Sequence, residues 1–105
     1  MLVPKQIKIG HQIWNIELVK LVDEQGVARP ASRLIQLHKD LEVDVMKDVL
    51  LHECLHACCS YAEMNDEAYD EEQFVSRLTP VIRTMFLTNP WLTNTLLVDE
   101  STVDD

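Results

Sequence analysis

The sequence has no long apolar run and no segment that resembles a targeting signal. No apolar stretch approaches the roughly 18 residues that a membrane span needs. The opening Met1–Lys5 is not followed by the apolar core of a secretory signal peptide. We therefore expect a cytoplasmic protein that does not have a membrane as partner.

Basic residues are also scarce. Nine Lys and Arg stand against 18 Asp and Glu, which gives a formal net charge of −9. Phosphate backbones and anionic lipids are bound by basic patches, so this balance argues against nucleic acid and against a lipid surface as partners.

Cysteine is absent outside one short stretch, where Cys54, Cys58 and Cys59 lie within six residues. Neighbours on one helix have poor disulfide geometry, and there are no distant partners. We expect reduced thiols, with Cys54 and Cys58 acting as small core residues.

What remains is the composition of an ordinary globular chain of 105 residues, with 47% apolar and 26% charged residues. This length predicts a single domain, which we place over residues 1–98. Residues 99–105 are dominated by acids and are expected to form a disordered tail.

The motif His52-Glu53-Cys54-Leu55-His56 carries the chemistry. Residues four apart lie on one helix face, one turn apart, so both imidazoles can reach one zinc ion. Glu53 lies about 100° around the axis from His52, beside the ion, where a carboxylate suits a general base. The motif predicts His52 and His56 as metal ligands and Glu53 as the catalytic residue.

Apolar residues recur around this motif at helical spacing, which predicts a helix over residues 43–64 with Asp40 or Asp44 as its N-cap. The alternative is two surface histidines on an amphipathic helix. Three strands are expected before the helix at residues 43–64, and a second helix is expected after it. Their ranges are 5–9, 12–22 and 33–38 for the strands and 70–87 for the helix.

The second helix should begin at Asp70 as N-cap and contain a kink at Pro80. Its expected apolar face contains Phe74, Val75, Leu78, Val81, Ile82 and Met85. Trp91 and Leu92 should fold back over the core.

A catalytic zinc site needs a third protein ligand. Cys59 and Glu63 are each seven residues from a histidine, about 10 Å along the axis, which is too far. Glu71 lies on the apolar face of the second helix and is preferred over Glu72, which lies on a more solvated face. Asp70 is a weaker option because its carboxylate suits the cap. The alternative for Asp70, Glu71 and Glu72 is that acids are favoured in the first turn of any helix, where they interact with the positive end of the helix dipole.

With a downstream Glu on a second helix, His52-Glu53-x-x-His56 resembles the gluzincin branch of the zincin metallopeptidases. The chain is more closely similar to small phage- and prophage-encoded HExxH proteins over residues 33–92. The shared pattern is Leu51–Ala57, then Glu71-Glu72-Gln73-x-Val75-x-x-Leu78, then Asn89-Pro90-x-Leu92.

This resemblance implies an α+β fold, with a small twisted three-stranded sheet packed on the HExxH helix and a second helix. It also implies that an edge strand, expected at residues 33–38, binds an extended peptide, and that a Tyr or His steadies the oxyanion. Tyr61, Tyr69 and His38 are candidates, while His11 is interpreted as a turn residue. A phage-encoded protein would act in the bacterial host cytoplasm.

Three functions remain open. The first is a zinc-dependent peptidase acting on a peptide or protein substrate, with Glu53 as general base. The second is a non-catalytic zinc-binding protein that acts through protein–protein interaction. The third is an interaction module without a metal.

Overall fold

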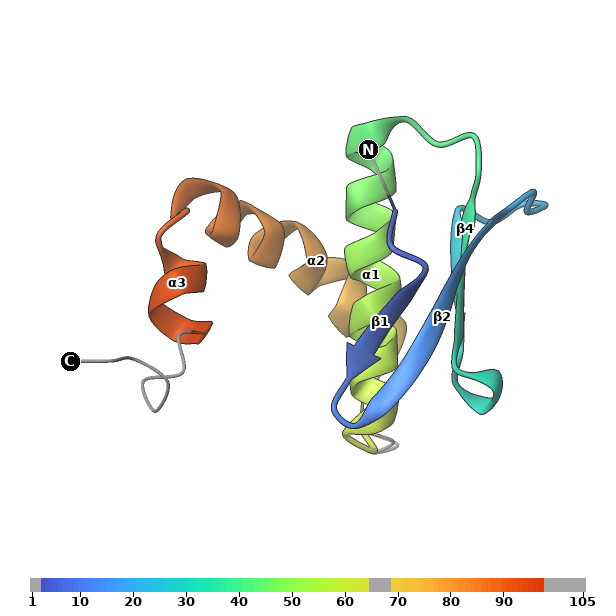
Figure 1. Ribbon diagram of the computed structural model, residues 1–105, viewed down its shortest axis with the longest axis horizontal. Helices are drawn as coiled ribbons and strands as arrows, with labels where there is room; N and C mark the ends of the chain where they lie inside the picture. The colour runs from blue at the N-terminus through green and yellow to red at the C-terminus, as the bar shows by residue number, and fades with distance from the viewer. Residues whose placement is uncertain (1–2, 65–68, 98–105) are drawn as a thin grey trace.

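The computed structural model describes residues 3–64 and 69–97. The elements in chain order are β1 (Gln6–Ile9), β2 (Gln12–Val19), β3 (Gly26–Arg29), the 3-10 turn η1 (Pro30–Ser32), β4 (Leu34–His38), α1 (Val43–Tyr61), α2 (Glu71–Thr88) and α3 (Leu92–Leu97). The α+β class is confirmed (Figure 1). The expected acidic tail lies outside the described residues. None of the helices in the described ranges is long and apolar enough to cross a membrane.

The sheet has four strands in the order β1-β2-β4-β3, so the prediction of three strands was wrong. β1 and β2 form an antiparallel hairpin, β2 and β4 are parallel, and β3 pairs antiparallel with β4. The missing strand was β3, which lies between the strands predicted at residues 12–22 and 33–38 and is only four residues long, flanked by turn-forming residues.

The expectation that residues 33–38 form an edge strand was also wrong. β4 is an inner strand, and its Ile35 and Leu37 are fully buried. The edge beside α1 is β3, whose outer backbone groups have no neighbouring strand in the sheet.

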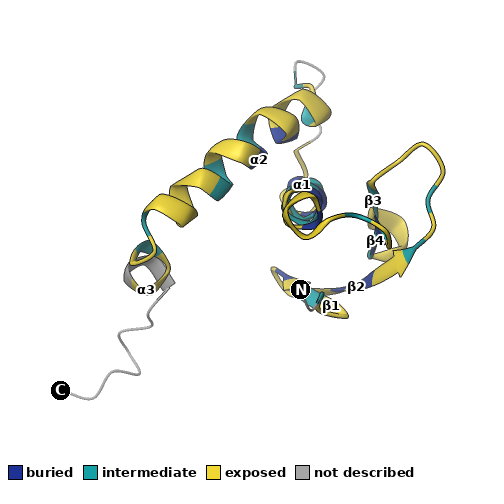
Figure 2. Ribbon diagram, turned by 90° about the horizontal axis from the view of Figure 1, so that it is seen from above, coloured by how far each residue is buried: buried dark blue, intermediate teal, exposed yellow. Residues whose placement is uncertain are grey.

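The main core lies between this sheet and α1. Figure 2 looks along α1 and shows the sheet curving around one side of the helix. The buried side chains come from both layers: Ile9, Trp14, Ile16, Ile35 and Leu37 from the sheet, and Met46, Val49 and Ala57 from α1. α1 begins after Glu42, whose side chain makes no capping hydrogen bond, so neither Asp40 nor Asp44 is the cap.

α2 lies on the opposite side of α1 from the sheet (Figure 2). Its predicted N-cap is confirmed, because the Asp70 carboxylate accepts a hydrogen bond from the Gln73 amide at 3.0 Å. Only Val75 and Thr79 are buried along its described length. Arg83 adds an ion pair to Asp48 of α1 at 2.5 Å.

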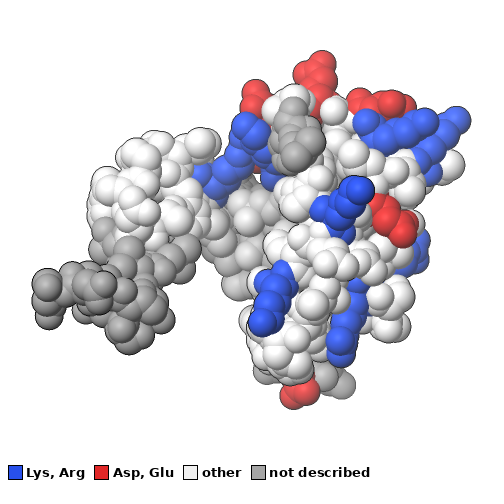
Figure 3. Space-filling view, viewed as in Figure 1, with Lys and Arg blue, Asp and Glu red and all other residues white. Residues whose placement is uncertain are grey.

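The second half of α2 runs away from the body of the molecule (Figure 1). α2 continues through Pro80 as one helix and ends at Thr88, one residue beyond the predicted range, and the kink expected at Pro80 stays a prediction. Of its predicted apolar face only Val75 is buried, and Val81 is 62% exposed. Trp91 is 57% exposed, so it does not cover the core as predicted. Residues 84–97 contain no charged residue, and this end of the molecule is white in Figure 3.

Gly10, in the β1–β2 turn, contacts the end of α1. Its φ is +59°, a conformation that side-chain-bearing residues rarely adopt, and a Cβ there would overlap the Tyr61 ring. We expect Gly10→Ala to lower the free energy of unfolding by about 2–3 kcal/mol, measured by chemical denaturation. In a Tyr61→Ala background the same change should cost only about 1 kcal/mol, the cost of the backbone conformation. Equal costs in both backgrounds would contradict the proposed overlap.

Candidate metal centre

α1 brings together the three residues of the HExxH motif. His52, Glu53 and His56 each offer a ligand atom within 4.8 Å of the others. The two imidazoles are half-buried and their ring centroids are 4.9 Å apart. A cluster of this composition and spacing could hold a metal ion.

The first turn of α2 brings two carboxylates to these histidines. Glu72 lies 3.2 Å from His52 Nε2 through one oxygen and 2.6 Å from His56 Nε2 through the other. Glu71 contacts the opposite nitrogen of His56, with 2.7 Å between its Oε2 and Nδ1. Both acids that the sequence singled out therefore reach the site, but in different positions.

These contacts bear on the choice of third ligand. The Glu71 side chain is 37% exposed and that of Glu72 is 66% exposed, which agrees with the sequence-based ranking by burial. However, the Nε2 atoms of both histidines face Glu72, whereas Glu71 reaches only the far side of one ring. Burial thus favours Glu71 as the third ligand, whereas contact geometry favours Glu72. Helical periodicity could not show which acid contacts the two Nε2 atoms.

The carboxylates also determine the protonation of the cluster. Burial disfavours the charged form of His56, but hydrogen bonds to Glu71 and Glu72 outweigh it and raise its pKa. For Glu72, partial burial favours the neutral form, but its contacts to His56, Ser76 and His52 prevail and lower its pKa. Ser76 contributes a hydroxyl that donates to Glu72 Oε1 at 3.1 Å.

Glu53 is the most enclosed member of the cluster, with only 6% of its surface exposed. Burial raises its pKa to about 7, with the nearby charge of His56 opposing this and those of Glu72 and Glu24 adding to it. Within the described part of the chain, no hydrogen bond joins its carboxylate to another group. A base with a pKa near neutrality is suited to proton transfer at physiological pH.

Gly26 on β3 explains how the strand comes so close to Glu53. A Cβ at this position would lie 2.7 Å from Cγ1 of Val49 and 3.1 Å from Cγ of Glu53. Only glycine allows this approach, so β3 covers the base from the sheet side. In the sequence, Gly26 lies between two predicted strands, where a glycine usually indicates a turn. Once β3 is recognised, a glycine in a strand is the signal for a close approach of the backbone.

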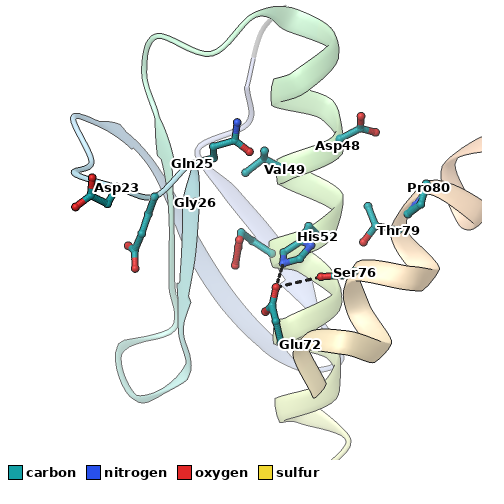
Figure 4. A pocket seen from close by; sticks show the side chains of 12 residues that line it. Asp23, Gln25, Gly26, Asp48, Val49, His52, Glu72, Ser76, Thr79 and Pro80 are labelled. Atoms are coloured by element: carbon teal, nitrogen blue, oxygen red, sulfur yellow. Dashed lines mark hydrogen bonds and ion pairs between the residues drawn. The ribbon is translucent and has the colours of Figure 1, made fainter. Parts of the chain in front are cut away.

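An open cleft of about 600 Å³ runs beside the cluster, between the β2–β3 loop, α1 and α2. Figure 4 shows His52 and Glu72 at its centre, joined by an ion pair, with Ser76 bonded to Glu72. A second hollow, lined by β3, His56 and Glu71, adjoins the first at His52, Glu53 and Glu72. The cluster therefore opens to solvent beside the sheet edge.

No protein family, curated protein or solved structure matches this chain. The interpretation of the cluster therefore depends on its own geometry.

The side chains expected to steady an oxyanion are engaged elsewhere. The Tyr61 hydroxyl lies 2.9 Å from His11 Nδ1, and the Tyr69 hydroxyl lies 3.1 Å from Cys59 Sγ. His11 itself lies in a turn, as predicted. His38 accepts a hydrogen bond from a backbone amide at 3.2 Å. None of these candidates is among the described residues that line the cleft.

The cysteines differ from the prediction in part. Cys54 is half-buried against the core, as expected, but Cys58 is exposed and Cys59 is the buried thiol. Burial raises the pKa of Cys54 to about 11, so it is a thiol at neutral pH. Turning by 100° per residue, the helix directs Cys58 away from the face of His52 and His56.

We expect the double change Cys54→Ala and Cys58→Ala to leave metal content unchanged. Stability should fall by about 1 kcal/mol, almost all of it from Cys54, because only that side chain packs against the core. Metal analysis and chemical denaturation would check both parts, with Cys58→Ala alone as the control that should be nearly neutral. Loss of metal in the double variant would identify the thiols as ligands instead.

Proposed function

We propose that this protein is a zinc-dependent peptidase of the gluzincin type, with Glu53 as general base. The observation that carries the proposal is the convergence of two imidazole Nε2 atoms on one carboxylate, beside a second, largely buried glutamate that makes no hydrogen bond to the described residues. Glu72 lies 3.2 Å and 2.6 Å from the two nitrogens, and Glu53 is 6% exposed.

The donor set fits zinc. Two histidines and a glutamate on separate helices are a known catalytic zinc set, which leaves one position open. We assign His52, His56 and Glu72 as the ligands, because one nitrogen of each ring and one carboxylate face a common point. When bound, zinc would lower the pKa of a coordinated water to about 7 and polarise a peptide carbonyl.

Glu71, the ligand expected from the sequence, takes a different role in this proposal. Its carboxylate accepts a hydrogen bond from Nδ1–H of His56 at 2.7 Å. A metal-bound histidine commonly donates its other ring N–H to such a carboxylate, which fixes the tautomer and the ring orientation. Glu71 would then hold His56 in position.

The chain's own residues supply the remaining requirements for peptide hydrolysis. Glu53 would accept a proton on its carboxylate from the attacking water and deliver it to the leaving amine. The free edge of β3 would bind the peptide in an extended form by β-strand addition. β3 would thus have the peptide-binding role that we expected for residues 33–38, and it is also the strand that covers Glu53.

The relation to small phage and prophage HExxH proteins, and action in the bacterial host cytoplasm, belong to this proposal. They are supported by the His52-Glu53-x-x-His56 and Glu71-Glu72 motifs.

One observation favours a non-catalytic zinc-binding protein that acts in protein–protein interaction. The described lining of the cleft contains no Tyr, Arg or Lys that could stabilise an oxyanion. A site that binds zinc without turnover would need no such group.

Two measurements separate these functions. Metal analysis of protein purified without added zinc or a metal-affinity tag tests whether the cluster binds zinc. Chelator-sensitive cleavage of a peptide library tests whether the bound zinc is catalytic; zinc without cleavage would favour the binding protein, and absence of zinc would exclude both.

A further inference from the structure

The cleft beside the cluster has an uneven charge. Among the described residues, its lining contains five acids, namely Asp23, Glu24, Asp48, Glu53 and Glu72, and no Lys or Arg. Figure 4 shows Asp23 on the loop side and Asp48 and Glu72 on the helix side, so the carboxylates occupy both walls.

Two of these acids already have cationic or hydrogen-bonding partners within the described chain. Asp48 pairs with Arg83 at 2.5 Å. Glu72 contacts both histidines of the cluster. Both carboxylates thus already have partners within the protein.

The other three carboxylates are not balanced in this way. Asp23 and Glu24 lie on the loop before β3 and make no ion pair with any described residue, and Glu24 lines both hollows of the site. Glu53 is more than nine-tenths buried, has no hydrogen bond to the described chain and lines the same cleft. No fully buried side-chain oxygen among the described residues lacks a partner, so the unbonded carboxylate of Glu53 meets the open space of the cleft, where a cationic ligand would contact it.

We propose that this cleft binds a Lys or Arg side chain of the substrate, next to the bond that is cleaved. The inference rests on the proposed function, because it places the peptide backbone on the β3 edge. The cleft suits such a side chain in two ways: Val49, Gly26 and Pro80 offer apolar surface for its methylene stem, and Asp23 and Glu24 offer charge for its head.

The test compares peptides that differ only in one central residue: lysine, arginine, the uncharged norleucine, or glutamate. Binding to the zinc-loaded protein is measured by fluorescence anisotropy, and cleavage by mass spectrometry. We expect the lysine and arginine peptides to bind about tenfold more tightly than the norleucine peptide, with the glutamate peptide weakest. The preference should shrink as salt concentration rises, because the cleft is open.

The double variant Asp23→Asn and Glu24→Gln should remove most of this preference and leave the zinc content unchanged. Asparagine suits position 23, where φ is +63°. Glu42→Gln is the matched control, since it removes a carboxylate at the residue before α1, ten residues from His52 and about 15 Å away along the helix axis, outside the lining of the cleft. It should keep the preference.

The outcomes separate this inference from the proposed function. Selective binding of the lysine and arginine peptides without cleavage would support the cleft and refute the peptidase. Cleavage of all four peptides at similar rates would support the peptidase and overturn the cleft assignment. A preference that survives in the double variant would also overturn it, and an absence of binding by every peptide would overturn both.

Discussion

Glu53→Gln is expected to abolish peptide hydrolysis and to leave zinc bound. Glutamine keeps the size of the buried side chain, which is 6% exposed, but it cannot accept the proton of the attacking water. Positioned acid–base catalysis contributes about 10²–10⁴ in rate, so the loss should be evident in kcat/KM. Zinc content should stay at about one per chain, because His52, His56 and Glu72 are unchanged.

The control for this variant is Glu63→Gln, two residues after the C-terminal end of α1 and outside the cluster. It should retain full activity. Undiminished chelator-sensitive cleavage by Glu53→Gln would show that the hydrolysis comes from a contaminating protease and would remove the evidence for a peptidase.

His56→Ala should lose most of the bound zinc, since two ligands seldom make a firm site. The two acids then discriminate between the possible ligand sets. If Glu72 is the third ligand, Glu72→Gln should reduce zinc affinity by at least 100-fold. Glu71→Gln should reduce it by only about 10–100-fold, the usual loss when a partner of a ligating histidine is removed. Metal competition with a chromogenic chelator measures all three.

His38→Ala is the matched control, because His38 lies on β4 outside the cluster. It should keep full zinc content. The reverse order of the two acids would restore Glu71 as the ligand, as the sequence predicted, and full retention by His56→Ala would refute the site.

The sequence predicted those features that depend on local chemistry. The HExxH helix, the strands β1 and β2, and the Asp70 cap each follow from spacing or from one side chain. β3 could not be found this way, because four residues carry too little periodicity. Its pairing with β4 is a tertiary contact.

The third ligand shows the same limit. Helical periodicity identified the acid nearer the apolar face, and Glu71 is indeed the more buried of the pair. Which acid reaches the Nε2 atoms depends on how α2 crosses α1, and a single sequence does not contain that angle. Trp91 was predicted to fold back over the core for a similar reason: its apolar character indicates a preference for burial but not where the chain runs after α2.

The two helices that form the centre are attached to the molecule with very different strength. His52 and His56 belong to α1, which is fixed by the whole sheet-side core, whereas Glu71 and Glu72 begin a helix whose described part buries only Val75 and Thr79. A cation bound by residues of both helices would stabilise the docking of α2 on α1, because its binding free energy would be added to that of the docked state. Binding of the ion and docking of α2 against α1 would then be coupled, so that a change that weakens one would also weaken the other.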